Sequence, residues 1–393
     1  MSALPSRIVV PDLARSSRSA WVVTFGLLLA GCGATPVKQP SAAPAASFRP
    51  LVPPSSAVDP VATSAHRTVL DPSHGDLIGE LQVTRATRED TFVDLARRFN
   101  VGYEELVRAN PGVDPWLPGA GREIVLPTRH ILPDAPREGI VINLAAMRLF
   151  YFPKRKPGEW LTVYTFPIGI GRVGWATPEG STSVVRMKKD PAWRPGSGVR
   201  AEHKADGEVL PVVVPPGPDN PLGHRALYLE WPSYLIHGTN KPAGVGLRSS
   251  HGCIRLFPED IELLYDLVKP GTRVTVVNQP FVFGWHEGEL LMQAHEVLED
   301  DPRDWQRAQR KLLSKSLAQR IQRDGGADDA ARLDYAFRLC VARPPHAQEH
   351  TRLLALLTDL RTPNAKDPAA SDQEAWTTVA RVLLNLDETI TRE

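Results

Sequence analysis

The sequence predicts a mixed, multi-domain protein: a small β-α-α-β module, a mainly-β domain with a β-sandwich or barrel-like sheet, and a C-terminal α-helical bundle. Three observations support this prediction. Residues 81–127 change from strand-like to helix-like periodicity and back, residues 138–279 hold short β-branched and aromatic runs between Pro and Gly clusters, and the last hundred residues carry apolar side chains at helical spacing. A chain of 393 residues, 42% of them hydrophobic, is long enough for two or three domains.

The overall composition excludes some classes of partner. Lys+Arg 46 against Asp+Glu 45 leaves almost no net charge, and no long run of one sign is present, so we expect no nucleic-acid partner. The cysteines Cys32, Cys253 and Cys340 are too few and too scattered for a disulfide framework. Their odd number leaves at least one unpaired, so each needs its own explanation.

Residues 1–32 have the pattern of an export signal. Three arginines precede a short apolar run at 20–30, which ends in the small residues before Cys32 and is too short to span a bilayer permanently. Leu29-Ala30-Gly31-Cys32 resembles the bacterial lipobox, which implies lipid modification of Cys32. Gly33 resembles the pattern of lipoproteins sent to an outer membrane, so we expect a periplasmic, lipid-anchored protein. An ordinary secretory signal containing a cysteine is the alternative.

Residues 33–76 are rich in Pro, Ala and Ser and have no sustained periodicity, which predicts an extended tether. Residues 77–128 predict the β-α-α-β module. Its first helix is indicated by the apolar series Phe92, Leu95, Ala96 and Phe99, with Asp90 or Thr91 as its cap. A second short helix at 103–108, a turn at Asn110-Pro111-Gly112 and a closing strand at 123–126 complete it.

The stretches DTF, LARRFNV, ELVRANP and IVLP of this module resemble the LysM module at the expected places. The resemblance implies binding to glycan that contains N-acetylglucosamine, such as peptidoglycan. No nucleophile stands beside a base in this segment, so we predict a binding module. A small structural domain with a vestigial groove is the alternative, because fold alone does not give function.

Residues 136–279 are predicted to form the mainly-β domain. Strand-like runs occur in 139–152 and 160–171 and in ALYLE, SYLIHG and RVTVVNQ, with one clear helix at Pro258–Val268. Residues 280–300 are expected to form a β extension and connector.

The candidate chemistry of this domain lies in HGTNKPAGVGLRSSHGCIRL, residues 237–256. A cysteine nucleophile needs a lowered pKa or an adjacent base, and a flexible loop could fold His237 back beside Cys253. The second ring nitrogen of that histidine then needs an acceptor. Because the next residue is Gly238, the acceptor would be a backbone carbonyl or a group from elsewhere.

The residues around Cys253 add three further expectations. Gly252 lets the backbone approach a substrate closely and leaves main-chain N–H groups free to face an oxyanion. On an extended chain His251 shares a face with Cys253, where it could orient the thiolate or Ser250, or contact substrate. Arg255 would share that face too, and a guanidinium suits a substrate carboxylate.

Two other interpretations of Cys253 remain open at this point. A zinc site could use His237, His251 and Cys253, but no fourth cysteine or obvious carboxylate stands near to complete it. A buried, unreactive cysteine is common in proteins, although two nearby histidines and a glycine disfavour that interpretation.

The stretch YLIHG…SSHGCIRL resembles the signature of the L,D-transpeptidase catalytic domain, the YkuD family. Residues 167–180, 200–223 and 251–264 resemble its ErfK/YbiS subgroup in particular. The resemblance implies a cysteine acyltransferase that acts on peptidoglycan stem peptides and requires no cofactor and no metal. The site residues that it implies are Cys253 as nucleophile, His237 as general base, Gly238 as the carbonyl that orients His237, His251 as the motif's second histidine, Gly252 as a further motif position, and Arg255, Ser250 and Thr239 as substrate contacts.

The family's reaction implies attack of the Cys253 thiolate on the third stem residue, release of D-alanine, and a thioester that carbapenems would also form. The acceptor stays open: an amine of another stem peptide gives a 3→3 cross-link, a lipoprotein lysine gives a wall anchor, and water makes an L,D-carboxypeptidase. A rival of another class is a non-catalytic, wall-binding lipoprotein. The enzyme is expected to have a reactive Cys253 with a low pKa.

Residues 301–393 predict helices. The first carries apolar positions at 308, 312, 313, 317 and 321, and three more candidates follow, which indicates a small bundle. Cys340 lies in the second, where we expect a buried hydrophobe. The tail resembles a domain of unknown function in large, often cytochrome-fused bacterial surface proteins. No CxxCH motif is present, which excludes haem attachment through that motif. For the role of the tail, docking of a partner and a structural cap stay equally open.

Overall fold

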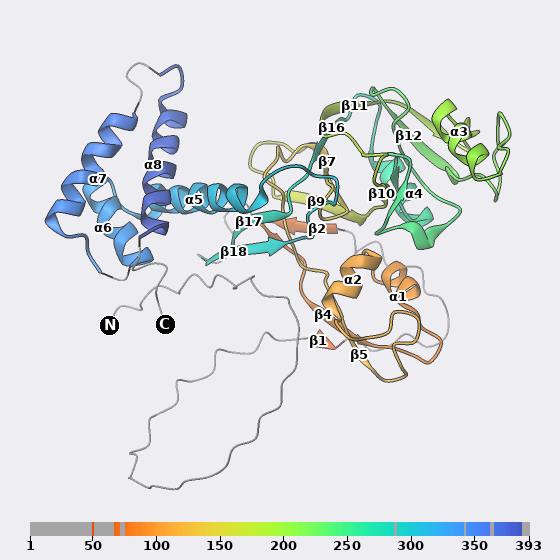
Figure 1. Ribbon diagram of the computed structural model, residues 1–393, viewed down its shortest axis with the longest axis horizontal. Coiled ribbons are helices and arrows are strands. Elements are labelled where there is room, and N and C mark those ends of the chain that lie inside the picture. Colours follow the sequence, from red (N-terminus) through yellow and green to blue (C-terminus); the bar gives the residue numbers. More distant parts are fainter. Residues whose placement is uncertain are drawn as a thin grey trace, which may run out of the picture.

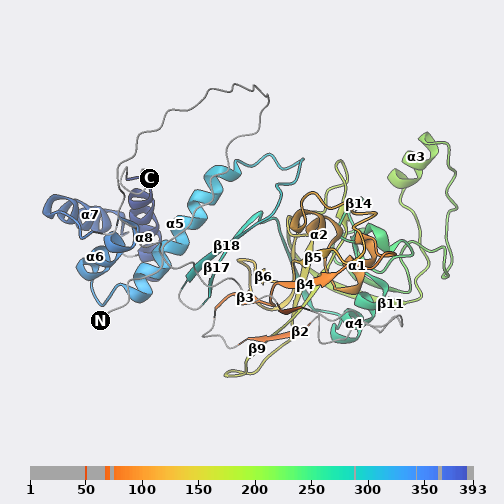
Figure 2. The same ribbon diagram turned by 90° about the horizontal axis from the view of Figure 1, so that it is seen from below.

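The computed structural model of the chain describes residues 49–50, 67–70, 75–286, 289–341, 343–361 and 365–386. The predicted signal peptide, Cys32 and most of the predicted tether lie outside these residues. Among the described residues, no helix is both long enough and apolar enough to cross a bilayer. The small module and the helical group lie against different sides of a central β-domain (Figures 1 and 2).

Within the described residues, nine strands form the central sheet in the order β15-β13-β12-β11-β16-β7-β8-β9-β2. The β16–β7 and β13–β15 pairs are parallel, and the other pairs are antiparallel. The strands are β2 (Arg67–Leu70), β7 (Gly139–Asn143), β8 (Arg148–Phe152), β9 (Leu161–Pro167), β11 (Gly180–Lys189), β12 (Arg225–Leu229), β13 (Leu235–His237), β15 (Ile254–Arg255) and β16 (Arg273–Val277).

Both faces of this sheet are covered in its middle. On β7, Ile140 and Ile142 belong to the main core together with α4 (Pro258–Leu267), whereas Val141 belongs to a second core with Phe150 and Phe152 of β8. Strands buried on both faces appear as continuous apolar runs instead of alternating ones. This explains the composition of residues 139–152 and confirms the predicted mainly-β domain.

One helix of this domain was not predicted. α3 (Ser197–Ala205) buries none of its residues and lies at the end of the molecule farthest from the helical group (Figures 1 and 2). The expectation of a single clear helix was therefore wrong, because α3 is short and Val199 is its only large apolar residue, which is too little to indicate a helix from the sequence. The remaining short elements here are β10 (Ile170–Gly171), β14 (Arg248–Ser250) and a 3-10 turn, η3 (Pro242–Gly244).

The small module has the predicted order of elements. β4 (Gln82–Arg85) pairs antiparallel with β5 (Glu123–Leu126), and α1 (Phe92–Arg98) and α2 (Tyr103–Ala109) lie between them in the chain. Thr91 is the cap of α1 and forms a capping box with Asp94, whereas Asp90 accepts from the amide of Thr87. The helices pack on the strands around a core that includes Phe92 and Leu95.

The predicted tether is shorter than residues 33–76. Its residues Arg67–Leu70 form β2, the edge strand beside β9, and β1 (Arg49–Pro50) pairs parallel with β4. Residues 77–78 form β3 (Leu77–Ile78), which pairs with β6 (His130–Ile131) outside the β-α-α-β module. Pairing with a distant strand orders such short segments, and the local composition does not reveal it.

The C-terminal part is helical, as predicted, and follows a β-hairpin of β17 (Phe281–His286) and β18 (Glu289–Ala294). Its core includes the fully buried Trp376, and Cys340 packs against that core with partial burial. The helices are α5 (Trp305–Asp324), α6 (Asp329–Cys340), α7 (Ala347–Leu360) and α8 (Pro368–Leu384).

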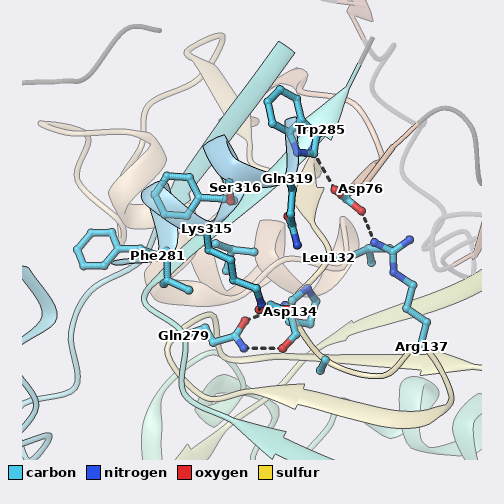
Figure 3. A pocket seen from close by; sticks show the side chains of 15 residues that line it. Asp76, Leu132, Asp134, Arg137, Gln279, Phe281, Trp285, Lys315, Ser316 and Gln319 are labelled. Carbon is cyan, nitrogen blue, oxygen red and sulfur yellow. Dashed lines mark hydrogen bonds and ion pairs between the residues drawn. The ribbon is translucent and has the colours of Figure 1, made fainter. Parts of the chain in front are cut away.

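A small cavity of about 260 Å³ marks where α5 meets the β-domain (Figure 3). The Lys315 ammonium of α5 lies 2.8 Å from the carboxylate of Asp134, and Gln279 donates to the Asp134 carbonyl at 2.9 Å. On the other side, the amide of Trp285 donates to Asp76 at 2.9 Å, and Asp76 also pairs with Arg137. The polar groups of this cavity therefore attach the helical part and the hairpin to the β-domain.

A buried ion pair joins the small module to the β-domain. Arg148 of β8 is 1% exposed, and its guanidinium lies 2.9 Å from Glu105 of α2 and donates to the carbonyl of Asn100 at 3.2 Å. Burial alone would raise the Glu105 pKa, but Arg148 and the neighbouring His130 hold it below its ordinary value. The pair is therefore ionised, and loss of either partner would leave a buried charge uncompensated.

Candidate active site

The register of three strands places the predicted site residues. β12, β13 and β15 are neighbours, with Ile236 opposite Ile254 and His237 opposite Arg255. The two isoleucines face the main core, so by the alternation of a strand the residues on either side of them face the other way. Leu235, His237, Cys253 and Arg255 accordingly line one cavity of about 730 Å³.

This cavity brings together most of the predicted residues. Ser250 and His251 line it as well, together with the aromatic side chains of Trp175, Trp193, Tyr228, Trp231 and Tyr234. Gly238, Gly252 and Thr239 are absent from its lining. The hydroxyl of Thr239 accepts from the Lys241 amide at 3.0 Å, and its side chain is buried, so the structure gives this residue a turn-stabilising contact instead of a place in the cavity.

His237 is held in its neutral form. Its Nδ1 lies 2.6 Å from the carbonyl oxygen of Gly238, the orienting contact that the resemblance implied. Because a carbonyl can only accept, Nδ1 carries the proton and Nε2 keeps its lone pair. Burial lowers the pKa of His237 to about 3, and the nearby Arg255 guanidinium acts in the same direction.

Cys253 is a thiol in this structure. Its Sγ is partly buried and donates to the carbonyl oxygen of Ser233 at 3.5 Å. Burial raises its pKa above the ordinary value, although a backbone hydrogen bond from Leu235 and the charge of Arg255 oppose the shift. The expected low pKa was therefore wrong for the free protein, since the sequence does not show how far the sulfur is withdrawn from water.

The turn that presents Cys253 depends on Ser250 and Gly252. Ser250 Oγ donates to the Cys253 carbonyl at 2.6 Å and accepts from the Gly252 amide at 3.1 Å, and Thr177 donates to the Gly252 carbonyl at 2.9 Å. The Gly252 N–H is thus bonded to the Ser250 hydroxyl, and the expectation that main-chain N–H groups beside Cys253 face an oxyanion stays a prediction. Its φ of +99° and a Cβ position only 3.0 Å from the Tyr234 ring both require glycine.

His251 belongs to a cluster that the sequence did not reveal. Its Nε2 lies 2.9 Å from a carboxylate oxygen of Glu202 on α3 and 3.0 Å from the Arg172 guanidinium, and its ring meets Trp175 edge-on at 4.9 Å. Burial and Arg172 lower its pKa, whereas Glu202 opposes them. Glu202 is 49 residues distant and on an unpredicted helix, so no local pattern could have found it.

Arg255 is half-buried on the cavity wall. Its Nη1 donates to the Ser249 hydroxyl at 3.4 Å, and its buried Nε has no hydrogen-bond partner among the described residues. Arg255 therefore lies on the wall of the cavity, and its contact with a substrate carboxylate stays a prediction.

We also asked whether the described side chains could bind a metal ion at this site. No group of three or more His, Cys, Asp or Glu side chains among them is arranged to hold a metal ion. The three candidate ligands considered for zinc, His237, His251 and Cys253, have separate partners, which are the Gly238 carbonyl, Glu202 with Arg172, and the Ser233 carbonyl.

Known proteins resemble this chain in the same region. Residues 137–276 match the model of the YkuD family, the L,D-transpeptidase catalytic domain. The probable L,D-transpeptidase YcfS of Escherichia coli K12 is 39% identical over 293 residues, which cover 72% of this chain and 88% of that protein. The probable L,D-transpeptidase ErfK/SrfK of Salmonella typhimurium is 42% identical over 233 residues, 58% of this chain and 74% of that protein.

A solved structure of the catalytic domain of the E. faecium L,D-transpeptidase also matches. It is 22% identical and covers 37% of this chain and 99% of that one, with a TM-score of 0.27, which is too low to support a conclusion.

The protonation state of Cys253 can be tested by measuring how fast an alkylating agent modifies it at different pH values. Because only the thiolate reacts and burial raises the Cys253 pKa, carboxamidomethylation of Cys253 should accelerate with pH through a midpoint above about 8.5, the value of an ordinary cysteine. The rate is read from intact mass, with Cys253→Ala reporting the background from Cys340. A rate that is already at its plateau near pH 6 would show a thiolate–imidazolium pair and contradict the neutral pair.

Proposed function

The chain belongs to the L,D-transpeptidase family, and on that premise we propose that Cys253 forms a thioester with the third residue of a peptidoglycan stem tetrapeptide. The observation that supports this most directly is the neutral His237. Its lone pair is preserved by the Gly238 carbonyl, and it lines the same cavity as the Cys253 thiol.

In the first half of the proposed reaction, Nε2 of His237 takes the Sγ proton while the sulfur attacks the carbonyl carbon of the third stem residue. The C–S bond forms, the amide bond to the terminal D-alanine breaks, and His237 returns the proton to the departing amine. A general base is needed because the resting cysteine is a thiol. Arg255 lowers the Cys253 pKa and so favours the charge that develops on sulfur.

In the second half an amine attacks the thioester, and its proton passes through His237 to the sulfur as the C–S bond breaks. We propose an amine of a second stem peptide as the acceptor, which gives a 3→3 cross-link. A lipoprotein lysine or water would complete the same half-reaction. The size of the cavity supports a peptide as the acceptor. Its volume of about 730 Å³ exceeds what one acylated residue fills, so space remains for a second peptide.

The remaining site residues are assigned supporting roles. Ser250 and Gly252 hold the turn that presents the sulfur, through the hydrogen bonds to the Cys253 carbonyl and the Gly252 amide. His251, fixed by Glu202 and Arg172, shapes the cavity wall beside the nucleophile. Arg255 is proposed to contact a substrate carboxylate.

We also propose that residues 77–128 are a LysM module that binds the glycan strand of peptidoglycan. Two apolar side chains in the loop between α2 and β5 support this: Trp116 is 62% exposed and Leu117 is 75% exposed. An exposed indole on a small module is a platform on which a sugar ring can stack. The same loop is held in place by the Phe92 amide, which donates to the Pro115 carbonyl at 2.7 Å.

The proposed location of the protein rests on its first residues, which lie outside the described part. We propose export by the signal in residues 1–32 and lipidation at Cys32, which would place the catalytic domain in the periplasm on a lipid anchor in the outer membrane.

The central test uses the soluble chain that begins after Cys32, with a disaccharide-tetrapeptide as substrate. D-Alanine release should be abolished in Cys253→Ala, retained in Cys340→Ala, and reduced about 10²–10⁴-fold in His237→Gln because the general base is lost. Product masses distinguish a cross-linked dimer from a hydrolysed tripeptide. Unchanged D-alanine release by Cys253→Ala would refute the thioester.

Glycan binding is tested separately by sedimentation with insoluble peptidoglycan. Trp116→Ala should weaken binding about 10-fold or more because it removes the stacking platform, which corresponds to about 1.4 kcal/mol. Trp160→Ala is the matched control, since Trp160 is 59% exposed on the β-domain. Equal effects of the two substitutions, or none, would argue against a glycan site at Trp116.

A further inference from the structure

The charges on the wall of the active-site cavity all have one sign. Its charged lining residues are Arg186, Lys188, Arg194 and Arg255, and no Asp or Glu from the described part of the chain lines it. The whole chain is almost neutral, with 46 Lys+Arg and 45 Asp+Glu, so this cavity concentrates positive charge. A cavity of this kind attracts an anionic ligand.

Arg186 is the cation whose orientation is best defined. The β11–β12 register places Arg186 opposite Tyr228, and its guanidinium carbon lies 3.8 Å from the centre of the Tyr228 ring. A guanidinium that stacks flat on an aromatic ring keeps its N–H donors pointing outward in its own plane, where they match a carboxylate. The stack therefore orients Arg186 in advance of ligand binding.

Neither Arg186 nor Lys188 forms a salt bridge with any described residue, although many other arginines of the protein do. Lys188 follows Arg186 at i+2, so both side chains extend from the same face of β11. Arg186 and Lys188 therefore share one cavity wall and have no carboxylate partner among the described residues. A ligand with a carboxylate can supply that partner.

The sheet register also gives the distance from the nucleophile. Tyr228 pairs with Leu235 of β13, and β13 is the neighbour of β15, which directly follows Cys253. Adjacent strands lie about 4.8 Å apart, so the stacked guanidinium over Tyr228 is roughly 10 Å from the Cys253 strand.

We propose that Arg186, stacked on Tyr228 and supported by Lys188, is a specificity-determining subsite for a free carboxylate of the stem peptides, roughly 10 Å from the strand that follows Cys253. The subsite selects stem peptides with that carboxylate over the same peptides carrying a carboxamide there. This inference rests on the proposed function. The carboxylate belongs either to the second residue of the donor peptide or to the diamino acid of the acceptor peptide, and the two sources share this chemistry.

The test compares free-acid and amidated peptides with the soluble chain that begins after Cys32. In the donor arm, kcat/KM for D-alanine release is measured with the second-residue carboxylate free or amidated. In the acceptor arm, dimer formation is measured with one donor and with the acceptor's carboxylate free or amidated. The readout is the acid-to-amide ratio of kcat/KM, which a general loss of folded protein does not change.

The wild-type ratio should exceed about 10 in one of the two arms, which identifies the source of the carboxylate. Arg186→Gln should bring that ratio to within about 2-fold of 1, and Arg186→Lys should restore only part of it because lysine lacks the planar fork. The matched control is Arg200→Gln, an exposed arginine of α3 outside the cavity lining, which should leave the ratio at its wild-type value.

Two results would overturn the subsite while leaving the proposed reaction intact. One is a wild-type ratio near 1 in both arms with D-alanine still released, and the other is an Arg186→Gln ratio equal to that of the wild type. If the wild type releases no D-alanine from any of these donors, the proposed function fails and the subsite fails with it.

Discussion

The parallel pairing of β13 with β15 is the constraint on which the site depends. It sets His237 opposite Arg255 and brings Cys253 beside Leu235, while the isoleucines between them anchor both strands in the core. The chain between the two strands must return to the same edge of the sheet, and it does so through a loop whose Gly246 lies against Gly102 of the small module. The positions of Cys253 and His237 and the contact with the small module therefore depend on the same connection.

Burial has opposite effects on ionisation at two places in the protein. Inside the joint between module and β-domain, Arg148 and Glu105 are withdrawn from water together and stay ionised as a pair. Inside the cavity, Cys253 and His237 are also withdrawn from water, but burial shifts both pKa values toward the neutral forms. In the reaction that we propose, the thiol and the imidazole become charged only as the sulfur attacks, and the Arg255 charge favours the thiolate.

The sequence was informative where a local pattern carries the structure. The series Phe92 to Phe99 predicted α1, and the histidine–cysteine stretch contains His237, His251 and Cys253, which line one cavity. The sequence was uninformative where contacts between distant segments determine the local structure. The contact between Glu202 of α3 and His251, and the pairing of edge strand β2 inside a Pro-rich segment, both join residues that are far apart in the chain. The Cys253 pKa was mispredicted for the same reason, because it depends on burial.

The most direct measurement is to quench the reaction of the soluble chain with a disaccharide-tetrapeptide in acid during the first turnover and to map the adduct by peptide mass spectrometry. The account predicts a thioester-linked tripeptide on the peptide that contains Cys253, while the peptide with Cys340, the other described free cysteine, stays unmodified. Turnover with an adduct on another residue, or with no covalent intermediate while D-alanine is released, would contradict it.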